Sequence, residues 1–388
     1  MKQIIYHFRT RGTGPEGVHI AGIAEGFEAA GYQVTFVSPT DRDPREHRGS
    51  NPFQQKRESV LQKLSRQAPQ LIFEMGEIAY NRSALKKMRA VAADCDWLYE
   101  RYAFFGHAAH SVAAELKRPY ALEVNELSGD DRVRPQVLTR LCASNERKVL
   151  QSAHAVFPVS RYLADRIIQL GVSARRVHVV PNGVDAAAFF GRPLASRTAV
   201  RRRHGLAAQD TLFVFVGWFV PWHQLERLLA AFARSFSNRP ECKLVLAGDG
   251  PLRQTLVEAA GRLQIEKQLI LPGAIEYTAI PEFLAAADVG LVPAVNAYRS
   301  PIKLFEYMAS GLPVVAADVE AVRSVLPDAQ ARLLFDQSDV ADLARALSAA
   351  AEAETVLGAA NRDLCRETFT YQNHARTICS IMENRSEH

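Results

Sequence analysis

The feature that most constrains the fold of this chain is the alternation of short apolar runs with segments of helical periodicity. The first run is QIIYHF, the apolar residues of GVHIAGIAEGFEAAG then recur at helical spacing, and YQVTFVSP follows as a second run. Short apolar runs are typical of buried strands, whereas apolar residues three or four apart are typical of amphipathic helices. This order predicts a strand, a helix and a second, parallel strand.

The same alternation continues through the first half of the chain. Further strands are predicted at WLYERY, PYALEVN, HAVFPVS and RVHVVPN, with helices at HAAHSVAAEL and SRYLADRIIQLG. Strands that alternate with helices form a mostly parallel sheet that is covered on both faces. The first half is therefore predicted to be a doubly wound α/β domain.

A second series of strands begins after the polar, arginine-rich stretch GRPLASRTAVRRRHGL. Its predicted strands are TLFVFVG, KLVLAGD, QLILPG, VGLVPA, PVVAAD and ARLLF. Because 388 residues are too many for one ordinary core, we expect two domains, residues 1–192 and 193–369. A C-terminal helix in residues 370–388 should pack back on the first domain. Ligands of such domains bind beyond the carboxyl ends of the strands.

Composition excludes several other classes of protein. Apolar residues make up 48% of the chain, and no apolar run approaches the roughly 18 residues of a membrane span. The five cysteines are scattered, which argues against a disulfide framework and against a zinc site. The first apolar run is interrupted by His7 and is too short for a signal peptide. We expect a cytoplasmic protein that binds no nucleic acid.

The segment GTGPEG, residues 12–17, matches the GxGxxG pattern of dinucleotide-binding loops and lies between a predicted strand and helix. The acidic residue that would bind a ribose is missing, because the second strand ends in Ser38 and Pro39. NAD binding is therefore not expected. Gly14 can still bring backbone amides close to another ligand, and a tight turn without a ligand explains the motif equally well.

Asp94 and Asp96 form a D-x-D pattern, which can hold a divalent cation against a nucleotide sugar. Because the pair precedes its strand instead of following it, we interpret the two residues as turn residues with solvated charges. The histidines show no metal-ligand spacing. No metal site is predicted.

The segment SPIKLFEYMASGLP in the second half raises an electrostatic question. Ser300 suits an N-cap, and Pro301 suits the first position of a helix. The N-terminus of a helix is partially positive and favours acidic side chains. Here, however, Lys303 lies in the first turn, and Arg299 lies just before it.

A bound phosphate would explain this misplaced cation. A solvated pair of Lys303 and Glu306 is the alternative, but it would stabilise the helix by only a few tenths of a kcal/mol. The amides at Ile302 and its neighbours, the helix dipole and Lys303 all favour negative charge at the same place. The segment therefore predicts an anion site.

Two other turns of the second half lie where a doubly wound sheet binds its ligand. The turn after TLFVFVG contains Gly217, Trp218, Trp222 and His223, and the turn after KLVLAGD contains Gly248. A core position for the two tryptophans is the alternative interpretation.

Together these motifs resemble the GT-B glycosyltransferases, in particular the large retaining family 4, also described as glycosyl transferases group 1. The resemblance rests on the order of GTGPEG, VSRYLADRIIQLGV, VVPNGVD, FVGWFVPWHQLERLLAAF, LVLAGDGPL, IPEFLAAADVGLVP and SPIKLFEYMASGLPVVA. It implies a GT-B architecture, with two doubly wound Rossmann-like domains that face each other across a cleft. The first domain would take the acceptor and the second the nucleotide sugar.

The resemblance also implies roles for individual residues. Glu306 takes the place of the second glutamate of the family's E-x7-E motif, which contacts the ribose, and Tyr298 stands where the family has the first glutamate, which touches the sugar. Four consecutive residues would hold the diphosphate: Ser300, Pro301, Ile302 and Lys303. Basic residues that many members carry after the first strand of this domain are replaced by Trp218 and the turn with His223. Charge compensation would therefore fall on Lys303, Arg299 and His223.

The activity that the resemblance implies is transfer of a sugar from UDP-, GDP- or another nucleoside diphosphate sugar to a hydroxyl or amine, with retention of configuration. Fixed cations and amides would stabilise the leaving diphosphate, so no cofactor and no metal ion are expected. Glu123 and Asn125, in LEVNE, end a strand of the first domain and are candidate catalytic or acceptor contacts. The alternatives are a sugar-nucleotide epimerase and a non-catalytic nucleotide-sugar-binding subunit.

The first half also carries the excess of positive charge. Residues 1–192 contain 27 Lys and Arg against 20 Asp and Glu, a net charge of +7, whereas the remainder carries −2. We hypothesise that this half faces an anionic partner, such as the inner surface of a membrane or a lipid-linked saccharide. A saccharide or small-molecule acceptor with a merely solvated basic surface is the alternative.

Overall fold

The computed structural model describes residues 2–12, 14–47, 69–130, 136–191, 197–203, 206–352 and 355–385. The chain folds into two compact units. The first consists of Met1–Asn182, Tyr298–Ser300 and Tyr371–His388, and the second consists of Gly183–Ala297 and Pro301–Thr370. No helix among the described residues is long and apolar enough to cross a membrane.

The first unit is built on a five-stranded parallel sheet. Its strands are β1 (Lys2–His7), β2 (Tyr32–Val37), β3 (Trp97–Arg101), β4 (Tyr120–Val124) and β5 (Ala155–Pro158), in the order β2-β1-β3-β4-β5. All five had been predicted from their apolar runs. The strand predicted at residues 176–182 was wrong, because this segment lies beyond the edge strand β5 and forms only one isolated bridge, from Val177 to Val156.

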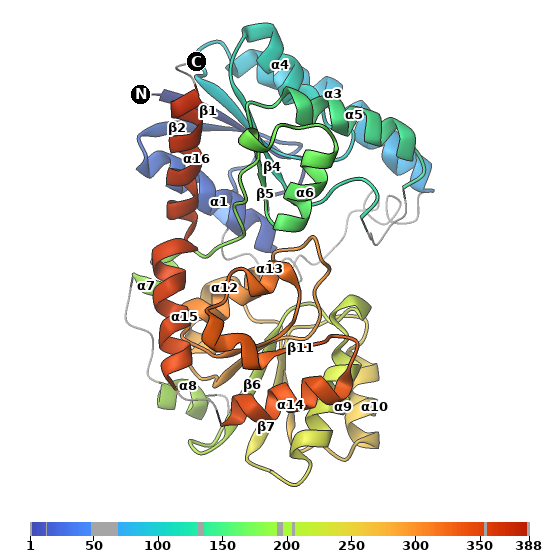
Figure 1. Ribbon diagram of the computed structural model, residues 1–388, viewed down its shortest axis with the longest axis vertical. Coiled ribbons are helices and arrows are strands. Elements are labelled where there is room, and N and C mark those ends of the chain that lie inside the picture. Colours follow the sequence, from blue (N-terminus) through green and yellow to red (C-terminus); the bar gives the residue numbers. More distant parts are fainter. Residues whose placement is uncertain are drawn as a thin grey trace. The chain divides into compact units, whose positions relative to one another are not determined.

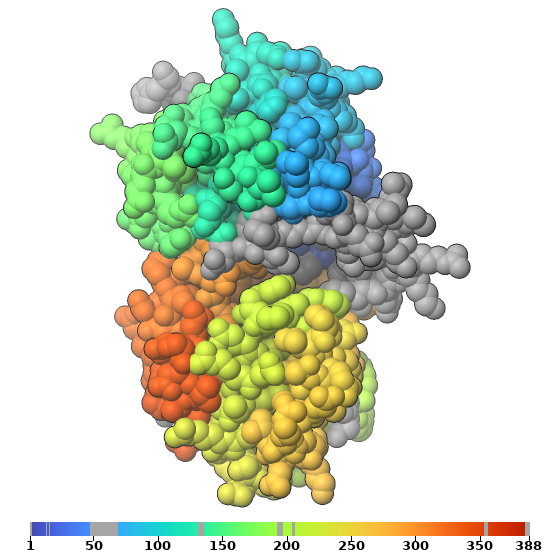
Figure 2. All heavy atoms as spheres, turned by 90° about the vertical axis from the view of Figure 1, so that its right-hand side faces the viewer, coloured from blue at the N-terminus to red at the C-terminus, as the bar shows by residue number. Residues whose placement is uncertain are grey.

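Helices cover both faces of the first sheet (Figure 1). They are α1 (Gly14–Ala29), α3 (Gln70–Val91), α4 (Ala108–Leu116), α5 (Thr139–Ser152), α6 (Arg161–Gln169) and α16 (Tyr371–Arg385), with 3-10 turns at Pro44–His47 and Ala174–Arg176. Residues of α3, α4 and α5 share one hydrophobic cluster with Leu98 and Leu122. Tyr99 on the opposite face contacts Phe27 of α1. α3 and α5 lie side by side at the surface (Figure 2).

The C-terminal helix α16 packs on α1 at two glycines. A Cβ atom at Gly22 would lie 2.2 Å from Cδ2 of Tyr371, and one at Gly26 would lie 2.5 Å from Cβ of Ala375. Only residues without a Cβ atom allow the helices to approach so closely. The last helix is therefore part of the first unit.

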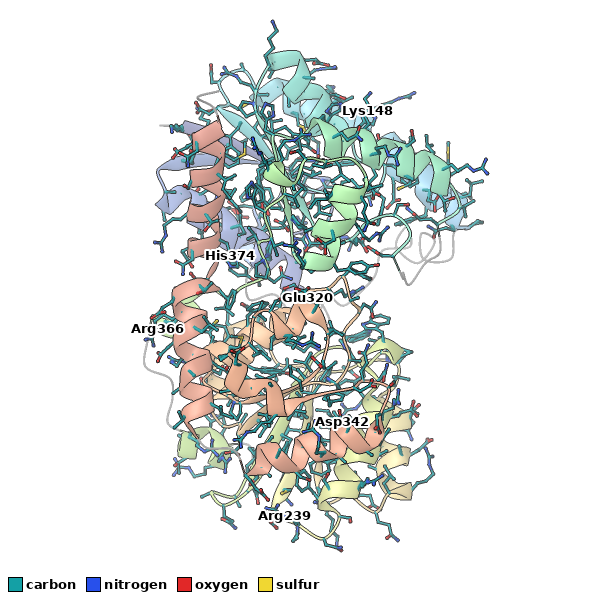
Figure 3. The ribbon with its side chains drawn as sticks, in the orientation of Figure 1. Lys148, Arg239, Glu320, Asp342, Arg366 and His374 are labelled. Carbon is teal, nitrogen blue, oxygen red and sulfur yellow. The ribbon has the colours of Figure 1, made fainter. Side chains whose placement is uncertain are left out.

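The second unit is built on a six-stranded parallel sheet. Its strands are β6 (Thr211–Val216), β7 (Cys242–Ala247), β8 (Leu269–Gly273), β9 (Val289–Val292), β10 (Val314–Ala317) and β11 (Leu334–Phe335), in the order β11-β10-β9-β6-β7-β8. All six had been predicted. Surface side chains such as Arg239 and Asp342 surround this core (Figure 3).

Helices also cover both faces of the second sheet. They are α7 (Ala186–Phe190), α8 (Arg197–Arg203), α9 (Leu225–Phe236), α10 (Arg253–Arg262), α11 (Ile280–Leu284), α12 (Ile302–Ala309), α13 (Glu320–Arg323), α14 (Val340–Ala351) and α15 (Thr355–Thr368). Short 3-10 turns occur at Pro221–His223, Tyr277–Ala279 and Asp328–Leu333. One hydrophobic cluster joins α9, α10 and α14 to the sheet, and a second joins α11, α12 and α15 to it.

The boundary between the units lies earlier than the predicted division at residue 192. Val184 forms a bridge with Thr370, and Phe189 lies in a hydrophobic cluster of the second unit. The arginine-rich stretch that suggested a linker contains α8, whose Arg201 is buried and pairs with Asp288 at 2.6 Å. The stretch thus belongs to the second unit, and the ion pair that holds it there cannot be seen in the sequence.

Candidate functional site

The anion site predicted in the second half lies at the centre of the second sheet. β6 and β9 are neighbours there. The sheet continues beyond β6 with β7 and β8, and in the opposite direction beyond β9 with β10 and β11. Ligands of doubly wound sheets bind at such a switch point, beyond the carboxyl ends of the strands. The loop that begins at Gly217 follows β6, and the segment that leads to α12 follows β9.

Lys303 is the central side chain of this site. Its Nζ is buried, lies 3.9 Å from the centroid of the Phe215 ring, and has no hydrogen-bond partner among the described residues. A Cβ atom at Gly217 would lie 2.8 Å from this nitrogen, so the glycine leaves room for it. Burial lowers the pKa of Lys303 to about 7, and Glu306 opposes this change. A buried ammonium without an acceptor is costly, and a bound anion would satisfy it.

Glu306 lies one turn further along α12 and is also buried. Burial raises its pKa to about 7, while Lys303 acts to lower it. Residues three apart on a helix share a face, so the two groups influence each other. Near neutral pH, both can therefore exchange a proton when a charged ligand binds. Strongly shifted pKa values of this kind are typical of functional sites.

The N-terminus of α12 is not capped by Ser300, and that prediction was wrong. The N-cap is Pro301, no side chain caps the helix, and its first turn contains no acidic residue. Ser300 is engaged elsewhere, because its Oγ accepts a hydrogen bond of 3.0 Å from the backbone N–H of Asn182. Since Pro301 has no N–H, the amides of Ile302 and Lys303 are the ones that can serve an anion.

Tyr298 and Arg299 contact each other in the segment before α12. Arg299 donates a hydrogen bond of 3.2 Å from Nε to the hydroxyl of Tyr298, and its guanidinium lies 5.4 Å from the centroid of that ring. The segment Tyr298–Ser300 belongs to the first unit, whereas Lys303 and Glu306 belong to the second. The structure therefore assigns Arg299 and Ser300 to a different unit from Lys303.

The loops after β6 and β7 approach each other at two glycines. A Cβ atom at Gly248 would lie 1.9 Å from the carbonyl oxygen of Gly217. The φ angles of Gly217 and Gly248 are 154° and 152°, a region that L-residues rarely adopt. Both predicted site glycines are therefore required by the backbone itself, and Gly217 lies next to Lys303.

Aromatic side chains surround the loop after β6. Trp218 and Trp222 are 37% and 38% exposed, which argues against the alternative that both are core residues. The ring of His223 meets that of Phe215 edge to face, with 5.1 Å between the centroids. Phe215 therefore contacts both His223 and Lys303, and the exposed tryptophans add an aromatic surface on the same loop.

Glu123 lies near the carboxyl end of β4 in the first unit, where it is buried. Its carboxylate accepts hydrogen bonds from Tyr6, His19, Tyr99, Arg101 and Asn125. Burial acts to raise its pKa, but His19 and Arg101 together hold that pKa well below its usual range. A carboxylate with so many donors joins three strands to α1. In this geometry Glu123 holds elements of the first unit together, and Asn125 donates one of its hydrogen bonds.

Gly14 begins α1, directly after the turn that follows β1. Gly12 and Gly14 have φ angles of 65° and 67°, and a Cβ atom at Gly17 would lie 2.2 Å from the carbonyl oxygen of Gly12. The glycines of GTGPEG are therefore needed to form the turn itself. Gly14 belongs to the first unit and Lys303 to the second, so the structure does not bring them together within one unit.

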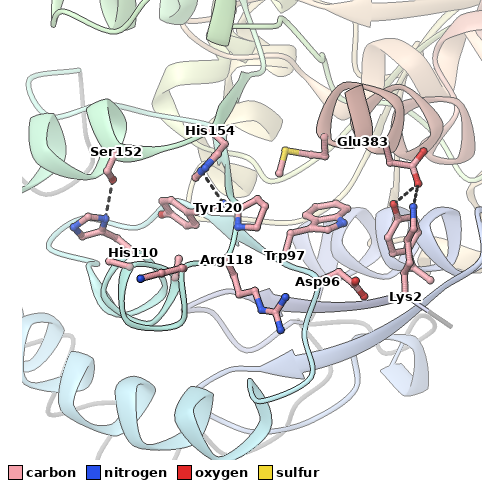
Figure 4. Close-up of a pocket in the computed structure, with 15 residues that line it drawn as sticks. Lys2, Asp96, Trp97, His110, Arg118, Tyr120, Ser152, His154 and Glu383 are labelled. Atoms are coloured by element: carbon pink, nitrogen blue, oxygen red, sulfur yellow. Dashed lines mark hydrogen bonds and ion pairs between the residues drawn. The ribbon is translucent and has the colours of Figure 1, made fainter. Parts of the chain in front are cut away.

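A cavity of about 760 Å³ lies at the edge of the first sheet where its strands begin, opposite the carboxyl ends of the same strands (Figure 4). Side chains of several elements line it, among them Lys2, Asp96, Trp97, Arg118, Tyr120 and Glu383. Asp96, from the D-x-D pattern, accepts a hydrogen bond of 2.6 Å from the backbone N–H of Gln3. The described residues contain no group of three potential metal ligands. Because doubly wound sheets bind ligands at the other edge, this cavity is not the candidate site.

Several residues on which the site depends were missed in the sequence. The most important is Phe215, whose ring lies against the Lys303 ammonium. The period-two alternation of TLFVFVG could have shown that Phe215 and Gly217 face the same side of the sheet. No comparable signal connects Glu123 to His19, because 104 residues separate them in the sequence.

Two family models match consecutive parts of the chain. The model described as Glycosyltransferase Family 4 matches residues 17–188, and the model described as Glycosyl transferases group 1 matches residues 196–363. The first match lies almost entirely in the first unit, and the second match lies almost entirely in the second unit.

Individual proteins show the same likeness. A D-inositol 3-phosphate glycosyltransferase of Geodermatophilus obscurus is 30% identical over 265 residues, which are 66% of this chain and 56% of that protein. A GDP-mannose-dependent alpha-(1-6)-phosphatidylinositol monomannoside mannosyltransferase of Mycolicibacterium smegmatis is 26% identical over 251 residues, 62% of this chain and 65% of that protein. The chain thus spans between half and two thirds of the length of these relatives.

Among solved structures, the Anabaena protein HepE in complex with UDP matches 99% of this chain and 100% of its own, with a TM-score of 0.72 and 18% identity. At this identity the likeness concerns the fold alone. The two family models, the similar proteins and the fold with two doubly wound units all point to the same family. The chain belongs to the GT-B glycosyltransferases of the group 1 and family 4 type.

Proposed function

We propose that this chain transfers a sugar from a nucleoside diphosphate sugar to a hydroxyl or amine of an acceptor, with retention of configuration. One observation carries the proposal: the buried Lys303 ammonium, which lacks a hydrogen-bond partner among the described residues, lies in the first turn of a helix without a side-chain cap. A diphosphate offers the acceptors that this ammonium and the helix amides can bind. The same charge would stabilise the diphosphate as it leaves.

The predicted donor residues take the following roles in this proposal. Lys303 and the amide of Ile302 bind the diphosphate, and Glu306 binds the ribose. The exposed rings of Trp218 and Trp222 offer a stacking surface for the sugar or the acceptor. The leaving phosphate can take the proton of the acceptor, so we assign no separate catalytic base.

Nucleotide binding gives the direct test of this function. UDP, GDP and their sugars should each be titrated while thermal unfolding is followed, since a ligand at 100 times its dissociation constant adds about 2.7 kcal/mol to the free energy of unfolding. We expect one base to stabilise the protein clearly more than the other. Failure of every nucleotide to raise the melting temperature would contradict the proposal.

Product analysis separates the proposed transferase from its two alternatives. A transferase releases nucleoside diphosphate in proportion to an added acceptor. An epimerase changes the sugar and releases none, and a non-catalytic subunit leaves the donor unchanged. The measurement is the amount of free nucleotide and of each nucleotide sugar, with and without candidate acceptors.

We expect the activity to survive excess EDTA. In this proposal Lys303 and the helix amides supply the positive charge that a metal ion supplies in other transferases. Asp96 binds a backbone amide at the amino-terminal edge of the first sheet, away from the strand ends at which such sheets bind ligands. Initial rates before and after chelation test this prediction. Complete loss of rate that added manganese or magnesium restores would show that the D-x-D pattern matters.

We further propose that the acceptor side of the protein contacts an anionic lipid surface. Large apolar side chains at the starts of two helices are 45–61% exposed, namely Leu71, Ile72, Met75, Val137 and Leu141. The Glu74 carboxylate accepts hydrogen bonds from the backbone of residues 137 and 138, so the two helix starts lie close together. Exposed basic side chains follow on α3 and α5, namely Arg82, Lys86, Arg140, Arg147 and Lys148. Eight others of the basic first half lie outside the described residues: Arg48, Lys56, Arg57, Lys63, Arg66, Arg132, Arg134 and Arg192.

Sedimentation with vesicles tests the lipid contact. The protein should pellet with anionic vesicles at low salt and less so as salt shortens the Debye length below about 10 Å. Changing Lys86, Arg140, Arg147 and Lys148 to Glu should abolish pelleting. The control changes four basic residues of the second unit to Glu, namely Arg239, Lys243, Arg262 and Lys267. Equal loss in both variants would indicate net charge alone, and no pelleting of the unchanged protein would exclude the lipid surface.

A further inference from the structure

Three residues shortly before α12, Tyr298–Ser300, leave the second unit and are held by the first. β9 and α12 belong to the second unit, but Tyr298–Ser300, between them in the chain, belongs to the first. The ring of Tyr298 is 4% exposed and lies in the hydrophobic cluster that α3, α4 and α5 form on the first sheet. This buried position of Tyr298 anchors the segment in the core of the first unit.

Ser160 forms the first polar contact with this segment. Its hydroxyl donates a hydrogen bond of 2.9 Å to the carbonyl oxygen of Tyr298, and it accepts one of 3.4 Å from the backbone N–H of Leu163 at the start of α6. Ser160 is buried. One hydroxyl thus caps a helix of the first unit and fixes a carbonyl five residues before Lys303.

Asn182 forms the second contact, with Ser300. Its backbone N–H donates to Oγ of Ser300 at 3.0 Å, and its side-chain Nδ2 donates to the carbonyl oxygen of Ser300 at 2.5 Å. Both residues are buried. Ser300 is therefore bound on both its side chain and its backbone, immediately before the chain enters the second unit at Pro301.

We propose that Ser160 and Asn182 are positioning residues of the donor site. Together with the Tyr298 ring they form a clamp that fixes the chain three residues before Lys303, and so determines where the amides of α12 and the Lys303 ammonium lie. The proposal rests on the proposed function, because it assumes that these groups bind the donor diphosphate. A misplacement of about 1 Å is enough to weaken such a contact strongly.

The clamp also means that a change in the first unit should alter donor binding in the second. Ser160 and Tyr298 are 138 residues apart in the sequence, and Asn182 and Ser300 are 118 apart. A purely structural role predicts only a loss of stability. A positioning role predicts, in addition, weaker nucleotide binding and faster amide exchange at the start of α12.

The experiment compares Asn182→Ala with Asn81→Ala. Asn81 is a matched control, because it is a buried asparagine of the first unit whose Nδ2 donates to a backbone carbonyl, that of Phe105, at 2.9 Å. Each variant is examined by thermal unfolding, by the dissociation constant of UDP or GDP, and by hydrogen–deuterium exchange in peptides that cover α12. Ser300→Ala and Ser300→Thr form a second pair, in which threonine retains the hydroxyl that accepts from Asn182.

We expect both asparagine variants to lower the melting temperature. Only Asn182→Ala should raise the nucleotide dissociation constant, about tenfold or more, and speed exchange at the start of α12. Ser300→Ala should do the same, and Ser300→Thr should restore binding. Equal nucleotide affinity in Asn182→Ala and the unchanged protein would overturn the positioning role. If the unchanged protein bound neither nucleotide, the proposed function would fail, and exchange in α12 would still decide whether the clamp holds the helix.

Discussion

Replacement of Lys303 by methionine should nearly abolish donor binding and at the same time stabilise the free protein. The first effect follows because a charge-assisted contact with a diphosphate contributes about 1.5–3 kcal/mol, which is roughly a 10- to 150-fold loss of affinity. The second follows because methionine removes a buried ammonium that has no hydrogen-bond partner among the described residues, while Glu306, whose pKa burial raises to about 7, can become neutral by taking up a proton. Binding calorimetry and thermal unfolding measure the two effects.

A matched control for this variant is Lys243→Met on β7. The Lys243 ammonium donates to the carbonyl oxygen of Lys267 at 3.2 Å and lies outside the proposed site. This change should leave nucleotide affinity unaltered. Glu306→Gln should weaken the ribose contact without removing the positive charge. Near-normal nucleotide affinity in both Lys303→Met and Glu306→Gln would refute the site assignment.

The pH dependence of binding follows from the shifted pKa of Lys303. Burial lowers this pKa to about 7, so Lys303 in the free site is largely uncharged at more alkaline pH. A diphosphate favours the ammonium, so binding must take up a proton above pH 7, and affinity should fall as pH rises through and beyond that value. Calorimetry in buffers of different ionisation enthalpy measures the proton uptake. Lys303→Met should lose the share of the uptake that belongs to Lys303 and retain only what Glu306 contributes.

Glu306 modifies this pH profile in a predictable direction. Its carboxylate acts to raise the pKa of Lys303. In Glu306→Gln the pKa of Lys303 should therefore fall further, and the loss of affinity should begin at lower pH. An unchanged profile in that variant would show that the two buried groups do not interact.

Replacement of Glu123 by glutamine should destabilise the protein severely, by about 3–5 kcal/mol, because it leaves buried donors around His19 and Arg101 unpaired. Removal of one partner from a buried charge network costs far more than loss of an exposed ion pair. Urea unfolding measures the effect. Glu126→Gln, three residues away and only partly buried, is the control and should change stability little.

The stabilising effect of Glu123 should also depend on pH. Its pKa is lower in the folded protein than in the unfolded chain, since His19 and Arg101 outweigh the effect of burial. The contribution is therefore fully present above the ordinary carboxyl pKa and is lost as pH falls towards the folded value. The Glu123→Gln variant should lose this part of the acid sensitivity. Normal stability with complete loss of activity would instead return Glu123 to a catalytic role.

The sequence by itself determined the secondary structure and the class of fold. Every strand of both sheets coincides with an apolar run, and the alternation of these runs with helices predicted two parallel sheets. It also led to the predicted anion site, because Lys303 at the start of a helix contradicts the helix dipole within a few residues of chain. Strand and helix preferences, and the dipole at a helix end, act over short stretches of sequence, so local patterns are sufficient to reveal them.

Only the tertiary structure revealed the contacts of Glu123, Ser300 and the arginine-rich stretch. Glu123 is a candidate catalytic residue from its place at the end of a strand, and only the fold shows that it binds His19, 104 residues away in the sequence. Ser300 resembled an N-cap until it was found to bind Asn182, 118 residues away. These contacts form because polar groups that are buried on folding need hydrogen-bond partners, and the partners come from whichever segments the fold places beside them. No pattern of neighbouring residues specifies such partners, so the sequence could indicate the site but not the clamp that holds it.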